Sequence, residues 1–144
     1  MATIKFTGLD EYIRKLENLT AHSRGICKMA VWEGGKVVGD AIKASLGNIP
    51  VQDEYVRKGE IRTGIRQEEK DAIIAAFGLS KMRTGSSIST KAGFNAGTKI
   101  RLVESGTSYM RKHPVVRQAI NGAKGAAEAA MAAKFTEEIQ KLIQ

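Results

Sequence analysis

Apolar positions recur at regular spacing through the first third of the chain. Alternation from Thr3 to Phe6 predicts a short strand that ends at Gly8. Three- and four-residue spacing then predicts an amphipathic helix of about three turns, whose apolar positions are Leu9, Tyr12, Ile13, Leu16 and Leu19. A longer helix is expected from about Ser23 to Leu46, with an apolar side made of Ile26, Ala30, Val37 or Val38, Ala41 and Ile42.

The second predicted helix contains three glycines in its middle, Gly34, Gly35 and Gly39. Each would cost roughly 1 kcal/mol relative to alanine, so close backbone approach is expected in return. Gly35 and Gly39 lie one turn apart and could form a flat face against another helix, of the same chain or of a neighbouring subunit. The alternative is a kink or break near Glu33 to Gly35, and the pattern leaves both open.

The segment from Gly47 to Arg66 has no clear periodicity and is too long for a passive connection in a compact domain. We predict an extended loop that becomes ordered against a partner, with a short strand around Tyr55 and Val56. Its charged residues mix both signs and give no electrostatic preference.

A third helix is predicted from Glu68 to Phe77, with Gly78 as its C-terminal cap. Polar and apolar residues then alternate between Ser80 and Leu102, and turn residues from Gly93 to Gly97 divide this region. The pattern predicts a β-hairpin. With the N-terminal strand, it would form a small sheet of three or four strands.

The last change of direction is expected between Val103 and Arg117, which read V-E-S-G-T-S-Y-M-R-K-H-P-V-V-R. Gly106 supplies backbone freedom and Pro114 presets φ for a first helical turn. The final helix should run from Pro114 to Leu142. The predicted fold class is therefore α+β: a small antiparallel sheet of three to four strands packed against two long helices, with a long loop after the second helix.

Length and composition agree with a single domain over residues 1–144. Cys27 is the only cysteine, which excludes an internal disulfide and is typical of a reducing compartment. The first residues lack the apolar run of a signal peptide, and no segment approaches the ~20 apolar residues of a membrane span. We expect a protein that works away from membranes.

The positive charge is concentrated in one third of the chain. The net charge is +8, and from Lys81 to Ala127 Glu104 is the only acidic residue. Such a bias favours a polyanionic neighbour, either a phosphate backbone or an acidic protein surface. The alternative is a solvated basic face that maintains solubility. The candidate polyanion-facing residues are Lys81, Arg83, Lys91, Lys99, Arg101, Arg111, Lys112 and Arg117.

Catalytic and metal-binding patterns do not emerge from the sequence. His22 and His113 are far apart, and neither has a second ligand at helical spacing. Ser105 and Ser108 lie near His113, with only Glu104 close by, which is a weak signal for a catalytic triad. A phosphate-cradling glycine motif is missing. We therefore expect no enzymatic activity, no metal and no cofactor.

The order of several short motifs resembles the tail-completion or head–tail joining proteins of long-tailed bacteriophages, also described as minor tail components. This family typically has a T-G step before its central helix, a V-E-x-G-T loop and a P-[FV]-[LV]-R-x-A start to its last helix. The corresponding residues are Thr63 and Gly64, then Val103, Glu104, Gly106 and Thr107, then Pro114, Val115, Val116, Arg117 and Ala119.

The resemblance implies a non-enzymatic virion protein of a tailed phage or prophage, present in the host cytoplasm during assembly. It would complete the tail and join it to the head connector as a ring of six copies, while a monomer in isolation is also compatible. Its partners would be connector or stopper proteins and tail terminator or tail tube proteins, with non-specific contact to DNA in the lumen. The candidate interface residues are Gly35, Gly39, Pro50, Val51, Tyr55, Val56, Thr63, Gly64, Glu104, Gly106 and Thr107.

A rival hypothesis is a small basic DNA-binding module that grips phosphates with its hairpin and the segment from Arg111 to Arg117. Only Phe94 and Tyr109 place aromatic rings within the basic region, and no recognition-helix motif is present. The sequence therefore favours the structural subunit.

Overall fold

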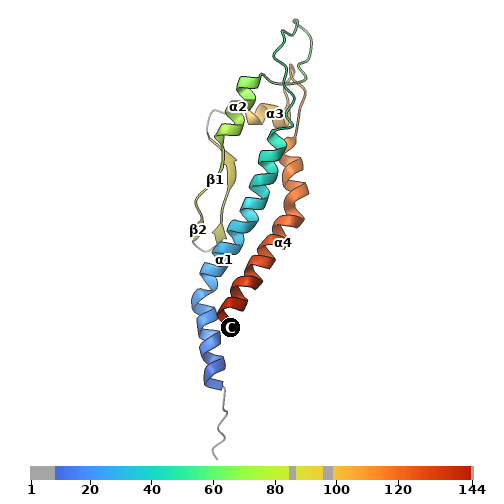
Figure 1. The fold of residues 1–144 in the computed structure, drawn as a ribbon. Coiled ribbons are helices and arrows are strands. Elements are labelled where there is room, and N and C mark those ends of the chain that lie inside the picture. Colours follow the sequence, from blue (N-terminus) through green and yellow to red (C-terminus); the bar gives the residue numbers. More distant parts are fainter. Residues whose placement is uncertain (1–8, 85–86, 96–98, 144) are drawn as a thin grey trace, which may run out of the picture.

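Two long antiparallel helices form the body of the molecule in a computed structural model that describes residues 9–84, 87–95 and 99–143 (Figure 1). Helix α1 covers Leu9–Leu46, and helix α4 covers Val115–Ile143. The predicted final helix is thereby confirmed to within a residue at each end. The strand predicted from Thr3 to Phe6 lies outside the described residues.

Helix α1 is continuous, so the prediction of two separate helices before Leu46 was wrong. Residues that often start helices lie inside α1, and their hydroxyl groups donate hydrogen bonds to carbonyl groups of the preceding turn. The Thr20 hydroxyl donates to the Leu16 carbonyl at 2.9 Å, and the Ser23 hydroxyl donates to the Thr20 carbonyl at 2.8 Å. Such back-bonding allows Ser and Thr to remain within a helix instead of capping a new one.

The glycines of α1 do not break the helix. They allow other elements of the chain to approach it closely. A Cβ atom on Gly34 would lie 2.5 Å from Cγ of Met131 in α4. On the same stretch of the pair, Ala30, Ala123 and Ala127 are buried. Small side chains therefore let α1 and α4 pack closely, and α1 has no break near Glu33 to Gly35.

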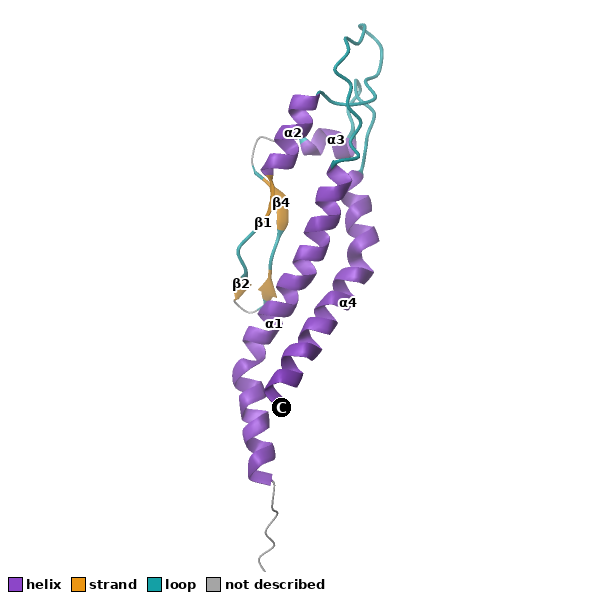
Figure 2. Cartoon of the chain, viewed as in Figure 1, coloured by secondary structure: helices purple, strands orange, loops and turns teal. Residues whose placement is uncertain are grey.

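The elements between the long helices form an arm beside α1 (Figure 2). In chain order they are α2 (Gln67–Ala76), β1 (Phe77–Leu79), β2 (Arg83–Thr84), β3 (Ile88–Ser89), β4 (Ala92–Phe94) and α3 (Ile100–Ser105). Strand β1 pairs with β4 and strand β2 with β3, both antiparallel. The α+β class with small antiparallel strand pairs and two long packed helices is thus confirmed, although the four strands form two separate pairs.

Three local predictions in this arm were wrong. Gly78 does not cap α2; it lies in β1 opposite Gly93. The backbone is already extended at Phe77, the residue after α2. The Phe77 ring contacts the Phe94 ring, with the ring centroids 5.3 Å apart. Gly93 itself belongs to β4 instead of a turn. The segment read as a second hairpin strand forms α3, because Ile100 and Val103 are buried together at helical spacing.

The hydrophobic core lies at the end of the molecule where α1 stops and α4 starts. It gathers one or two side chains from each of several segments: Ile42, Leu46, Ile49, Ile65, Ile73, Ile100, Val103 and Val115. At the opposite end α1 continues past the end of α4 (Figure 1), and there Ile13 and Leu16 are 42% and 45% exposed. We call the first region the loop end and the paired helices away from it the shaft.

Candidate interaction site at the loop end

Three motifs that lie far apart in the sequence meet at the loop end. The ring Nε2 of His113 donates to the Thr63 carbonyl at 2.7 Å, and the His113 amide donates to the Val103 carbonyl at 2.7 Å. Arg62, the residue before Thr63, forms a parallel bridge with Met110. The T-G step, the V-E-S-G-T-S loop and the H-P-V-V-R segment are therefore one hydrogen-bonded unit.

Two glycines of this unit serve internal packing. A Cβ atom on the buried Gly64 would lie 2.5 Å from the Pro50 carbonyl oxygen. Gly106 has a φ of 72°, in the left-handed region, and a Cβ atom there would lie 2.8 Å from the Lys112 amide nitrogen. Both candidate interface residues are thus required by the fold of the same chain.

Glu104 caps helix α4 from the neighbouring α3. Its carboxylate accepts hydrogen bonds from the amides of Val116, at 2.6 Å, and Arg117, at 3.3 Å. These amides belong to the first turn of α4, which lacks partners within the helix. A negative charge at this position also suits the helix dipole. Glu104 therefore has a structural partner in its own chain.

The long loop predicted from Gly47 to Arg66 is present and is fixed at its base. The Gln52 amide donates to the Ile65 carbonyl at 2.7 Å, and the Gln52 side-chain oxygen accepts from the Thr63 amide at 2.9 Å. The Asp53 carboxylate accepts from the Gln67 amide at the start of α2, at 3.0 Å. Val51 forms an isolated bridge with Ile65. The strand predicted in this loop around Tyr55 and Val56 is absent, because the backbone pairing of the loop occurs at its base.

Beyond this base the chain presents large apolar side chains to solvent. We call residues 53–61 the distal loop. Tyr55 is 89% exposed and Ile61 is 60% exposed, whereas Val56 is half-buried. Tyr109, on the adjacent 107–110 turn, is 73% exposed. Thr107 in that turn is exposed, and its amide donates to the Met110 carbonyl at 2.9 Å. Pro50 is exposed next to Val51.

A cavity of about 200 Å³ opens at the root of the distal loop, and we call it the basal cavity. Its floor includes buried Ile65 and Val103, and its rim includes Leu102, which is 46% exposed, and Tyr109. Arg62, Glu69 and Lys99 supply its charged groups. It is thus a small, mostly apolar hollow with two cations and one carboxylate.

Electrostatic interactions around the basal cavity favour the charged form of Glu69. The hydrogen bond from the Lys99 ammonium lowers the pKa of the Glu69 carboxyl, and the Arg62 charge adds to this, while partial burial opposes it. Arg62 donates from Nη2 to the Gln52 carbonyl at 2.6 Å, but its buried Nε has no hydrogen-bond partner among the described residues. The cavity therefore carries a net positive charge.

The glycine face predicted on α1 is covered by the arm of the same chain. A Cβ atom on Gly35 would lie 2.7 Å from Cγ2 of Thr90, and one on Gly39 would lie 3.3 Å from Cδ2 of Leu79. The face therefore contacts Leu79 of β1 and Thr90 between β3 and β4 instead of a helix. Gly39 is buried by this contact, and Gly35 is half-buried.

The candidate polyanion-facing residues are exposed but belong to two groups. Lys81, Arg83 and Lys91 belong to the strand arm, where no acidic residue lies among residues 77–84 and 87–95. Lys99, Arg101, Arg111, Lys112 and Arg117 lie around the loop end, where Lys99 is paired with Glu69. The basic third of the sequence is therefore not a single basic face.

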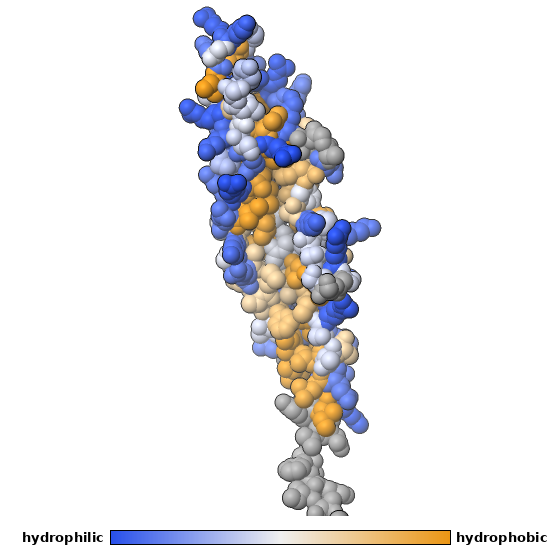
Figure 3. All heavy atoms as spheres, turned by 180° about the vertical axis from the view of Figure 1, so that it is seen from behind, coloured by the Kyte–Doolittle hydropathy of each residue, from blue (hydrophilic) through white to orange (hydrophobic). Residues whose placement is uncertain are grey.

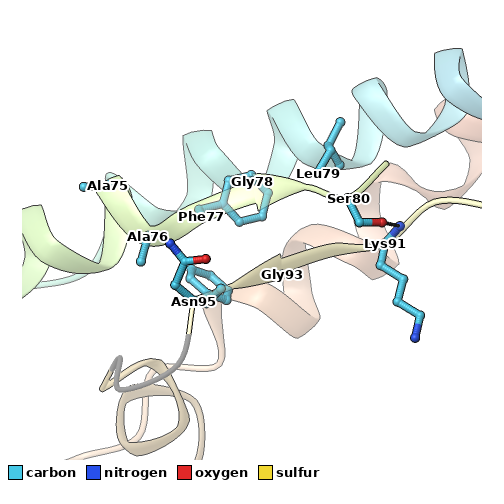
Figure 4. A pocket seen from close by; sticks show the side chains of 10 residues that line it. Ala75, Ala76, Phe77, Gly78, Leu79, Ser80, Lys91, Gly93 and Asn95 are labelled. Carbon is cyan, nitrogen blue, oxygen red and sulfur yellow. Dashed lines mark hydrogen bonds between the residues drawn. The ribbon is translucent and has the colours of Figure 1, made fainter. Parts of the chain in front are cut away.

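The strand arm holds a second hollow, of about 340 Å³, between residues 75–80 and 91–95 (Figure 4). The Lys91 amide donates to the Ser80 hydroxyl at 2.9 Å, and the Lys91 side chain points away from the hollow. Backbone, apolar groups and single polar side chains line the rest. None of the residues that line this hollow is acidic or a histidine.

Sequence reasoning missed the residues that define the basal cavity, notably Arg62, Glu69 and Leu102. Leu102 falls in the predicted second strand of the hairpin, and Arg62 lies in the predicted long loop without a predicted role. The only available signal was Tyr109, an aromatic residue within a polar turn. Residues 62–69 and 99–110 come together only in the tertiary structure, and no local sequence pattern indicates that they do.

Two further features are absent from residues 9–84, 87–95 and 99–143. No group of three or more His, Cys, Asp and Glu residues in this part could hold a metal ion. None of the helices there is long and apolar enough to span a membrane. Comparisons of the chain with protein-family models, curated proteins and solved structures find no match.

Proposed function

We propose that this chain is a structural virion subunit of a tailed phage or prophage, which forms a ring at the head–tail junction and joins the completed tail to the head connector. One observation carries the proposal: the three motifs of the family resemblance form a single hydrogen-bonded unit at the loop end. Thr63, Val103 and His113 are linked directly within it.

The position of the exposed apolar residues supports a role in assembly. Tyr55, Ile61 and Tyr109 lie on the loops that this unit holds. Apolar residues also continue along the helix pair toward the N-terminal end of α1 (Figure 3). Aromatic residues exposed on a fixed base are typical anchors of protein interfaces. An elongated subunit with such a loop end could bridge two neighbouring rings.

The proposal is tested by complementation of a phage that lacks its own copy of the gene. Replacing Tyr55 and Ile61 together by Ser should leave the protein folded, because both side chains are exposed. We expect heads and tails to accumulate unjoined. Wild-type particle yield with this variant, at equal protein level, would contradict the proposal. Replacing exposed Ile120 by Ser on α4 provides the control.

A salt titration separates this function from duplex binding. For a DNA-binding module, the affinity for duplex should fall steeply with salt, and replacing Arg111, Lys112 and Arg117 by Ala should reduce that slope. We expect no binding that depends on these three residues. Light scattering with and without a short duplex at low salt measures this directly, and a mass gain that needs duplex would favour the rival.

A further inference from the structure

None of the residues that the structure describes fills the basal cavity. Tyr55 is 89% exposed and does not line it, although the distal loop starts at the same root. Cavities of about 150 Å³ can hold a benzene molecule, so a hollow of about 200 Å³ has room for a phenol ring. Its floor and rim, with Ile65, Val103 and Leu102, suit an aromatic side chain.

The charge at the cavity indicates what should accompany such a ring. Arg62 and Lys99 outnumber the single carboxylate of Glu69. Arg101, adjacent to Leu102, is exposed and has no ion pair among the described residues. An aromatic residue next to a carboxylate would therefore complement both the floor and the edge of the cavity.

The distal loop has this combination. Tyr55 follows Glu54, which is exposed and has no ion pair within the part of the chain that the structure describes. Asp53 is used to cap α2, so Glu54 is the carboxylate next to Tyr55 in the sequence that remains for a partner, while Glu60 lies farther along the loop. The fixed base at Gln52 and Thr63 limits the ordering cost of docking to the residues between them.

We propose that Tyr55 of one copy enters the basal cavity of a second copy, with Glu54 facing Lys99 and Arg101 of that copy. This contact rests on the proposed function and specifies the interface of its ring. About four residues from the base, extended at roughly 3.3 Å each, let the loop tip reach about 13 Å. The entering loop and the receiving cavity are different, neighbouring patches of one subunit, so a contact without a return exchange is heterologous, the kind that closes into rings.

Engineered cysteines test the contact even if association is weak. In a Cys27→Ser background, Tyr55→Cys and Leu102→Cys on separate chains should form a disulfide-linked dimer when mixed under mild oxidation. Both changes on one chain should give a ladder that ends at the closed ring. Tyr55→Cys mixed with Ile120→Cys is the control, because Ile120 has similar exposure to Leu102.

Complementary surface variants test whether the loop of one copy binds the cavity of another. A loop variant, Glu54→Lys with Tyr55→Ser, and a cavity variant, Arg101→Glu with Leu102→Ser, should each lose self-association. Their mixture should recover a mass of two chains and no more, because one intact loop and one intact cavity remain. Ile120→Ser with Lys124→Glu is the matched control and should behave as wild type.

Equal cross-linking of the 55–102 and 55–120 pairs would overturn the inference, as would a complete absence of the 55–102 cross-link in concentrated protein and in assembled particles. The doubly substituted chain could form the cross-linked ladder while the loop variant still joins heads to tails normally. That result would support the contact and refute the virion role. Loss of joining without any 55–102 cross-link would keep the virion role and refute the contact.

Discussion

The loop end and the shaft are stabilised by different kinds of side chain. At the loop end, branched residues such as Leu46 and Val103 have no exposed surface. In the shaft, contact between α1 and α4 depends on Ala30, Ala123 and Ala127, together with the approach of Met131 to Gly34. Since stabilisation by burial follows the apolar area removed from water, most of it should come from the loop end.

This difference suggests a division of roles. A core made from α1, α2, α3, α4 and the long loop fixes the segments that support the distal loop and the basal cavity. The shaft sets the length of the molecule, and among its described residues the buried side chains apart from Ile26 are alanines. Changes at the loop end should therefore affect global stability, and changes at exposed positions of the shaft should have small effects of either sign.

The largest effect is expected from the core. Replacing Ile73, which is 1% exposed, by Ala should lower the free energy of unfolding by about 2–5 kcal/mol, because it removes buried methyl groups and leaves a cavity. Ile120→Ala on the shaft, where the residue is 43% exposed, should change it by no more than about 0.5 kcal/mol. Urea unfolding measures both. Similar losses would show that the two regions are equally important.

A smaller loss is expected from the turn at Gly106. Gly106→Ala should cost about 1–3 kcal/mol, since alanine there is strained and its Cβ atom would meet the Lys112 backbone. Gly59 also has a positive φ, of 96°, but nothing lies within 4 Å of the added atom. Gly59→Ala should thus show only the backbone strain, about 1–2 kcal/mol. Thermal unfolding of the two variants separates strain from steric clash.

The shaft should respond in the opposite direction. Gly122 and Gly125 lie in α4 with open space around them. Replacing either by Ala should stabilise the protein by up to about 1 kcal/mol through helix propensity. Gly34→Ala should gain less, because Met131 must first move aside. A midpoint of thermal unfolding that falls for Gly122→Ala would indicate that the exposed side of α4 is packed against something.

The smallest effect concerns the ion pair at the basal cavity. The folded-state pKa of Glu69 is lowered, so its contribution is present above its ordinary pKa of 4.5 and is lost as pH falls through the lower folded value. Lys99 is largely exposed and Glu69 is partly exposed, so the contribution of the pair should stay below about 1 kcal/mol. The stability difference between wild type and Glu69→Gln should therefore shrink below about pH 4.5. Glu68→Gln, at an exposed neighbour, is the control.

The sequence predicted the parts of the fold that have strong periodicity or distinctive turn residues. The final helix starts next to Pro114, and the long aperiodic segment before Gln67 is a loop. Boundaries failed where local patterns were ambiguous. The predicted second helix starts at about Ser23, which lies inside α1, and the short 98–103 segment fitted strand alternation as well as helical spacing.

The candidate site was predictable only in part. Tyr55 and the long loop were identified, whereas Gly64, Glu104 and Gly106 proved to hold their own chain together. Motif residues that fix a fold and motif residues that meet a partner look alike in one sequence. Only the tertiary contacts of Glu104 and Gly106 distinguish them.

The pairing of α1 with α4 joins the first described helix to the last. During translation, α1 is complete at Leu46, but residues from Val115 onward must still be synthesised before its partner exists. At about 5–20 residues per second, this leaves the apolar stripe of α1 uncovered for several seconds. The nascent chain is therefore expected to need protection by a ribosome-associated chaperone during that interval, and ribosome profiling of chaperone-bound chains would detect it.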